Sequence, residues 1–210
     1  MAALAAATLV VYSKPTQRDE PMIDSSLETR SALPDALRVL VAEYPRAGWE
    51  SDPGFDGLLR FWLDRHLMFR KIIQQLSDEA EGFLDTPDNP DRYAQRLGRL
   101  GGMFVDQLHG HHTIEDTQYF PKLIGLNARI ESGFDILDKD HHAIDAHLNA
   151  FVAAANAVLQ RRDAVMRMHA EVGKFHQELA GLQKLLNRHL IDEEELVVPV
   201  ILKHGFSGMD

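Results

Sequence analysis

From residue 34 onward, apolar side chains recur at steps of three and four residues, the spacing of a helix that buries one face. The alternation of apolar and polar residues that marks a half-buried strand is not found there. The pattern predicts a short helix and then four long ones, over about Pro34–Ala42, Phe55–Leu84, Asp91–Phe120, Ala128–Leu159 and Asp163–Lys203. Such helices, joined by short connections, predict an all-α fold: an up-down-up-down four-helix bundle with a short N-terminal helical extension.

The stretches between these helices contain residues that end helices. Thr86–Pro90 is a run of turn formers and prolines, and Gly205 stands where the last helix needs a C-terminal cap. The polar stretch 13–31 contains two prolines and cannot bury enough apolar surface to offset the entropy of ordering. We therefore expect a flexible tail at 1–32, a short helix and connector at 33–54, and the bundle at 55–205.

The apolar stripes define the expected core. On the first two long helices they consist of Leu58, Phe61, Trp62, Phe69, Ile72, Ile73 and Leu76, and of Leu97, Leu100, Phe104, Leu108 and Ile114. Polar residues interrupt the stripe on each of the four helices. They are His66 on the first helix, His111 and Glu115 on the second, His141 on the third, and His189 and Glu193 on the fourth. All four helices therefore direct imidazole toward the bundle axis.

Two of the interruptions belong to an internal repeat. The segments Leu108–Pro121 and Leu186–Pro199 share the pattern L-x2-H-x3-E-x5-P without gaps. Each copy is preceded, on the previous helix, by a single inward histidine. Two such helical hairpins packed about a pseudo-twofold axis would bring four histidines and two glutamates together.

Buried imidazoles and carboxylates without partners cost several kcal/mol each, while a whole domain is stable by only about 5–15 kcal/mol. A pair of metal ions would balance these charges, because a His at i and a Glu at i+4 can bind and bridge ions about 3.5–4 Å apart. Imidazole and carboxylate ligands favour iron or manganese, and zinc accepts the same atoms. The Glu-x-x-His pattern of ferritin-like di-iron proteins is absent.

Composition narrows the chemistry further. Without cysteine the chain has no disulfide, thiolate nucleophile or cysteine-held iron–sulfur cluster, which suits a reducing cytoplasm. The formal net charge of −10 argues against nucleic acid and against anionic membranes as partners. The apolar N-terminal stretch at 1–11 is too short to span a bilayer and has no basic residue ahead of it. We expect a cytoplasmic protein that binds no membrane and no nucleic acid.

The order of a lone His, His-x3-Glu, a second lone His and a second His-x3-Glu resembles the hemerythrin-like (HHE cation-binding) domain family, over about Leu58–Lys203. The resemblance implies two iron ions bridged by two carboxylates and an oxo or hydroxo group, with manganese or zinc as less favoured metals. It further implies the ligand assignment: one iron on His66 and His111, the other on His141 and His189, and bridging carboxylates from Glu115 and Glu193.

The third helix departs from the family pattern. Oxygen-carrying hemerythrins have a second His four residues after the first, and this chain has Asp145 there. One coordination position is therefore filled by Asp145, filled by a histidine elsewhere, or left open, which argues against simple reversible O2 carriage.

Two neighbouring histidines compete with the assigned ones. His112, with Asp116, forms another His-x3-carboxylate pair one step round the helix, but His111 keeps the apolar stripe and matches the repeat. His142 shares its helix face with polar residues, which favours His141. In the acidic run 192–195 we expect Glu193 to point inward and the other three residues to be solvated.

The resemblance implies two classes of function. In the first, a binding or sensing protein takes up O2, peroxide, NO or iron itself. In the second, an enzyme with peroxidase-like, catalase-like or ferroxidase activity turns over peroxide or oxidises ferrous ions. Both need open iron positions, so the sequence leaves the choice between them open, along with any redox or protein partner.

Overall fold

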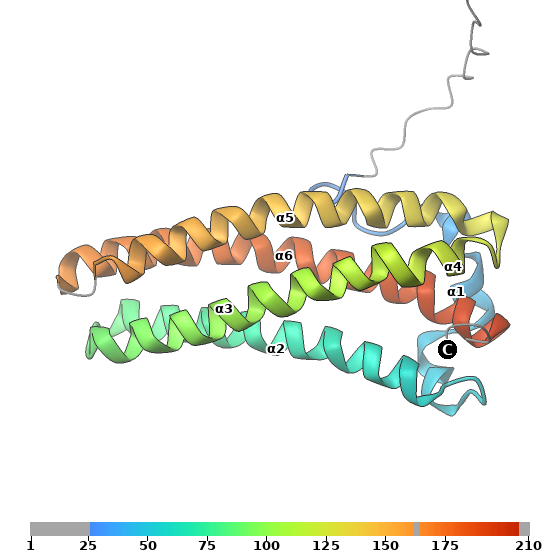
Figure 1. The fold of residues 1–210 in the computed structure, drawn as a ribbon, viewed down its shortest axis with the longest axis horizontal. Coiled ribbons are helices and arrows are strands. Elements are labelled where there is room, and N and C mark those ends of the chain that lie inside the picture. Colours follow the sequence, from blue (N-terminus) through green and yellow to red (C-terminus); the bar gives the residue numbers. More distant parts are fainter. Residues whose placement is uncertain (1–25, 162–163, 206–210) are drawn as a thin grey trace, which may run out of the picture.

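The computed structural model describes residues 26–161 and 164–205. Its long helices are α2 (Gly57–Asp85), α3 (Pro90–Ile114), α5 (Glu131–Leu159) and α6 (Val165–His204). They lie side by side, with contacts from α2 to α3, from α3 to α5, from α5 to α6 and from α6 back to α2 (Figure 1). Every regular element in the described ranges is helical, which confirms the all-α prediction. The expectations for the first 25 residues and for a helix start at Asp163 lie outside the described residues.

Capping residues set the limits of the long helices. The side chain of Asp56 accepts a hydrogen bond from the backbone N–H three residues on, at 2.9 Å, and Asn89 does the same at 3.1 Å. Pro90 occupies the first turn of α3, where a missing N–H costs nothing. Gly205 follows α6 with a φ of 72°, a conformation that glycine adopts without strain, so the predicted cap is confirmed.

The predicted helix over Asp91–Phe120 changes its hydrogen-bond pattern near its end. α3 gives way to a π-helical turn, η3 (Glu115–Tyr119), and then to a short helix, α4 (Phe120–Ile124). Pro121 lacks an N–H and disfavours regular α-helical bonding, but Pro199 at the equivalent repeat position lies inside an uninterrupted α6. Proline alone therefore does not explain the π turn. Turns of this kind occur often at functional sites, and this one begins at a predicted ligand.

The N-terminal extension is more ordered and begins earlier than the sequence predicted. Its elements are η1 (Asp35–Leu37), α1 (Val39–Glu43) and η2 (Arg46–Ser51). A further short helix, η4 (Ala128–Ile130), lies in the connection before α5. Leu27 and Arg30 are already buried, so packing starts before residue 33 and the expected flexible stretch is wrong for these residues. Figure 1 shows this segment running along α5 and α6 before it reaches the end of the bundle where α1 lies.

Two apolar clusters fill the bundle, and they are separated along its length. The first is built around Phe69, Phe104, Phe151 and Phe175, and the second around Trp49, Trp62, Phe120 and Phe134. Most stripe residues are buried as predicted. Phe61 and Ile114 are exceptions, exposed at 61% and 48%, because they lie at the edge of their helices and face a surface groove between α2 and α3. The predicted histidines occupy the layer between the two clusters.

Candidate metal centre

All six predicted site residues are buried between the two apolar clusters. They are His66 from α2, His111 from α3, Glu115 from the first position of η3, His141 from α5, and His189 and Glu193 from α6. The sequence repeat thus places its polar residues at one depth in the bundle, and the structure brings the whole predicted set together. We call this set, with His112, the polar layer.

One half of the polar layer contains His66, His111, Glu115 and Glu193, whose candidate ligand atoms all lie within 4.8 Å of one another. The Nε2 atom of His66 is 3.0 Å from that of His111, which is 3.0 Å from Oε1 of Glu115. Oε2 of Glu193 lies 3.4 Å from His66 Nε2. Four side chains from four segments therefore converge on a volume suited to one cation.

The other half contains His112, His141 and His189, again with ligand atoms within 4.8 Å of one another. The rings of His112 and His141 stack with centroids 4.0 Å apart, and His189 lies 4.8 Å from His141 in an edge-on arrangement. His112 is 3% exposed and was not among the predicted ligands. This half thus has three histidines where the sequence assignment has two.

The sequence analysis did not assign His112 as a ligand, because it expected one inward-facing residue per helical turn. α3 packs against both α2 and α5, so two consecutive residues can each face a neighbour. The ring of His111 lies 5.0 Å from that of His66 on α2, while His112 stacks on His141 of α5. The His-His pair in the sequence was the available signal.

The two other rivals do not join the polar layer. The side chain of His142 is 78% exposed, and its Nδ1–H donates to the backbone carbonyl of Asp138 at 2.8 Å. The side chain of Asp145 is 49% exposed and faces His109 at 4.0 Å. The sequence left open which residue fills the remaining coordination position. Of the candidates, the structure brings the buried His112 to the site.

Several polar atoms of the layer have no hydrogen-bond partner although they are buried. These atoms are both ring nitrogens of His112, Nε2 of His141 and of His189, Oε2 of Glu115, and both carboxylate oxygens of Glu193. Buried polar atoms are nearly always paired, and leaving one unpaired costs about 1–3 kcal/mol. Imidazole nitrogens and carboxylate oxygens are the kinds of atom that coordinate cations in proteins, so the residues present fit a metal centre.

A second set of carboxylates lies behind three of the histidines. Nδ1 is 3.1 Å from Glu194 in His66, 2.7 Å from Asp116 in His141 and 3.2 Å from Asp140 in His189. A carboxylate at Nδ1 favours the tautomer in which that nitrogen donates, which leaves the Nε2 lone pair for a metal. These three rings are therefore held in the orientation that a ligand needs.

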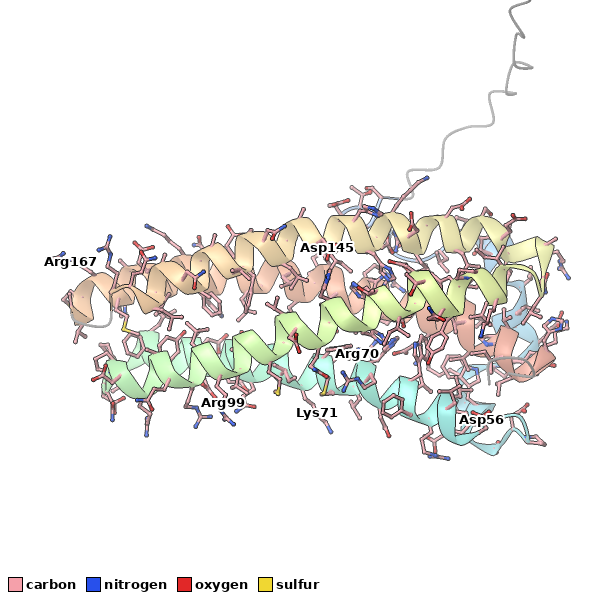
Figure 2. All side chains as sticks on the ribbon, in the orientation of Figure 1. Asp56, Arg70, Lys71, Arg99, Asp145 and Arg167 are labelled. Carbon is pink, nitrogen blue, oxygen red and sulfur yellow. The ribbon has the colours of Figure 1, made fainter. Side chains whose placement is uncertain are left out.

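The expectation that three residues of the acidic run 192–195 are solvated was wrong for two of them. Asp192 and Glu194 are buried, because arginines cover them. Arg188 pairs with Asp192 at 2.6 Å, and Arg70 pairs with Glu194 at 2.8 Å. Arg70 is labelled in Figure 2 and lies on α2 near the middle of the bundle. Arg188 lies one turn before Asp192 on α6, whereas helical periodicity alone does not reveal a partner on another helix such as Arg70.

Burial and mutual repulsion set the protonation of the layer. Burial lowers the pKa of His66, and lowers those of His112 and His189 well below the ordinary value, so these rings are neutral and able to bind cations. Burial and the charge of Glu115 raise the pKa of Glu193 well above its usual range. In the absence of a cation one of the two carboxylates thus retains a proton, which a cation would replace.

The family model of the hemerythrin HHE cation-binding domain matches residues 57–201. The chain belongs to this family. The hemerythrin domain begins with α2 and ends within α6, so it contains the whole polar layer and leaves the N-terminal extension outside. Neither the curated proteins nor the solved structures gave a match. None of the helices in the described ranges has the length and apolarity needed to cross a bilayer.

Proposed function

We propose that this hemerythrin domain holds two iron ions in the polar layer and presents them to a small ligand such as O2, peroxide or NO. One ion would be held by His66 and His111, the other by His112, His141 and His189, with Glu115 and Glu193 between them. The observation that carries the proposal is the set of buried, unpartnered nitrogen and oxygen atoms that converge from all sides of the bundle. Cations are the groups that would satisfy them together.

The bridging role of the two glutamates rests on their contacts with both halves of the layer. Glu115 places Oε1 3.0 Å from His111 and Oε2 3.8 Å from His141. Oε2 of Glu193 lies 3.4 Å from Nε2 of His66 and 3.4 Å from Nε2 of His189. A carboxylate that contacts histidines of both groups suits two ions about 3.5–4 Å apart.

Iron is the metal we favour because the donors are imidazole and carboxylate, with no thiolate in the chain. When bound, such a pair of ions supplies redox chemistry and open coordination positions for a small ligand. Manganese and zinc accept the same donors, and elemental analysis distinguishes the three metals.

The half with two histidines is the side on which we place the small ligand. It has one imidazole fewer than the other half, and His111 lines the groove to which Phe61 and Ile114 are exposed. A narrower apolar pocket reaches Glu115 beside Trp62. Trp62 Nε1–H donates to Glu115 Oε1 at 2.6 Å, which fixes this carboxylate at the bottom of the pocket. Narrow apolar access suits diatomic molecules and peroxide better than larger substrates.

Elemental analysis with optical spectra of freshly purified protein tests the proposal. We expect about two iron ions per chain and absorption bands from a coupled pair. A metal-free protein that stays empty when ferrous ions are supplied would overturn the proposal, as would full loading of a variant in which both His189 and Glu193 are replaced by alanine.

Stopped-flow spectroscopy separates binding from turnover. One reversible spectral change per added ligand supports a binding or sensing protein. Continuous loss of peroxide, with the iron content unchanged, would instead assign the centre to an enzyme.

A further inference from the structure

The side chain of Arg30, from the N-terminal extension, is buried against α5 and α6. Its Nη1 donates to Oδ1 of Asp140 at 2.7 Å, and its Nη2 donates to the other oxygen of the same carboxylate. Its Nε donates to Oδ2 of Asp192 at 2.8 Å. One guanidinium therefore pairs with carboxylates of two different helices.

Asp140 connects Arg30 to the polar layer. The carboxylate oxygen that receives Arg30 Nη2 is also 3.2 Å from Nδ1 of His189. On the far side of that ring, Nε2 is unpartnered and lies in the half that contains His112 and His141. The contacts form a chain that begins outside the family domain and ends at a candidate ligand.

We propose that Arg30 is a positioning residue of the metal centre: it holds Asp140 so that His189 keeps its Nδ1–H tautomer and turns Nε2 toward the ions. The N-terminal extension is then a functional part of the centre, although it precedes the residues 57–201 matched by the family. This inference rests on the proposed function, in which His189 is a ligand.

The need for an arginine follows from the charges. Asp140 and Asp192 are both buried, and a buried carboxylate without a partner is strongly unfavourable. Arg188 also pairs with Asp192, whereas the ion pairs of Asp140 are with Arg30 and His189. The planar guanidinium fork fixes the carboxylate in one orientation, which the single ammonium of lysine does not.

The other half of the centre has support from within the domain. Glu194, behind His66, pairs with Arg70 of α2 at 2.8 Å as well as with Arg46 of the extension at 2.6 Å. Loss of Arg30 should therefore affect the ion at His189 and spare the ion at His66. This selectivity distinguishes positioning from a general loss of stability.

The test compares full-length Arg30→Met, Arg30→Lys and Arg38→Met proteins. Arg38 is the matched control, because it also joins the extension to α6, through Glu195 at 3.0 Å, without a contact to a histidine of the layer. Metal-free protein is titrated with Co²⁺ in a calorimeter. The tautomer of His189 is read separately from its ring ¹⁵N shifts in the metal-free protein.

We expect Arg30→Met to weaken one of two Co²⁺ sites by about tenfold to a hundredfold, the range for residues that support metal ligands. Arg30→Lys should show a smaller loss at the same site, and Arg38→Met none. The ¹⁵N shifts of His189 should indicate mixed tautomers in Arg30→Met. Wild-type affinities at both sites together with an unchanged tautomer would overturn the inference.

Two further outcomes are informative. If Arg30→Met does not fold, Arg30→Lys decides, since it retains the charge: one weakened site supports the inference, and two wild-type sites overturn it. If the wild type itself binds no Co²⁺, the proposed metal centre fails. The tautomer of His189 still tests whether Arg30 positions Asp140 and His189 in that case, because that measurement needs no metal.

Discussion

The first apolar cluster and the polar layer both draw most of their residues from the same four long helices, yet they differ in how their buried atoms are satisfied. In the cluster, Phe104 packs against the rings of Phe69 and Phe151, which have no polar atoms that need a partner. In the polar layer, seven buried nitrogen and oxygen atoms have no partner. The aromatic rings of the cluster need no ligand, whereas in our proposal cations supply the missing partners of the layer. Stability and metal content should therefore respond separately to changes in the two regions.

The largest effect on stability is expected in the cluster. Phe104→Ala removes a fully buried ring that contacts Phe69 and Phe151, and such substitutions cost about 3–5 kcal/mol in the free energy of unfolding. Chemical denaturation measures that loss. The number of iron ions per folded chain should stay at the wild-type value. A fall in iron content that accompanies the loss of stability would show that the two regions do not respond separately.

Replacing His112 should lower stability by a smaller amount, through the metal. His112→Ala removes a buried imidazole that we propose as a metal ligand, so the ion in the half with His141 and His189 should bind at least about tenfold more weakly. If the free metal is about a hundred times the wild-type Kd, the stabilisation at risk is about 2.7 kcal/mol. His142→Ala is the matched control, because the exposed His142 is the equivalent neighbour of His141.

Elemental analysis and melting curves with and without metal measure both variants. His142→Ala should behave as wild type under either condition. Equal metal loss in the two variants would show that exposure does not decide which of these histidines binds.

Much of this comparison is visible in the sequence. The histidines and glutamates on the apolar stripes stood out because each replaces a residue such as leucine at a buried step, and the repeat confirmed their register. The carboxylates behind the rings did not stand out, because a charged helical residue normally faces water. Arginines from distant segments pair with Asp140, Asp192 and Glu194, and sequence spacing contains no record of these pairs, although it does show Arg188 one turn before Asp192 on the same helix.

Glu193→Gln sharpens the comparison by replacing an ionisable carboxyl group of the layer with a neutral amide of the same shape. The pKa of Glu193 is raised in the fold, so its contribution to stability is present below the unfolded value of about 4.5 and is lost as the pH rises through the folded value. At a pH above the unfolded value, the metal-free variant should therefore be more stable than metal-free wild type, by about 1–3 kcal/mol.

Urea denaturation of both metal-free proteins across the pH range measures this difference. It should grow with pH, and the variant should gain less stability from added iron than the wild type does. A metal-free variant less stable than wild type at neutral pH would contradict the account.

The smallest effect compares two buried tryptophans. Trp62→Phe removes the donor to Glu115, and Trp49→Phe removes a donor to the carbonyl of Tyr44 at 2.8 Å. Each should cost about 1 kcal/mol in the free energy of unfolding. Only Trp62→Phe should also shift the optical bands of the iron-loaded protein. A matching shift in Trp49→Phe would show that the bands respond to general loosening.

Anomalous X-ray diffraction at the iron absorption edge, from crystals of the iron-loaded protein, tests the central claim most directly. The account predicts two peaks about 3.5–4 Å apart, between the side chains of His66, His111, His112, His141, His189, Glu115 and Glu193. Crystals grown with excess iron that show no peak in this layer, or peaks only at the protein surface, would contradict it.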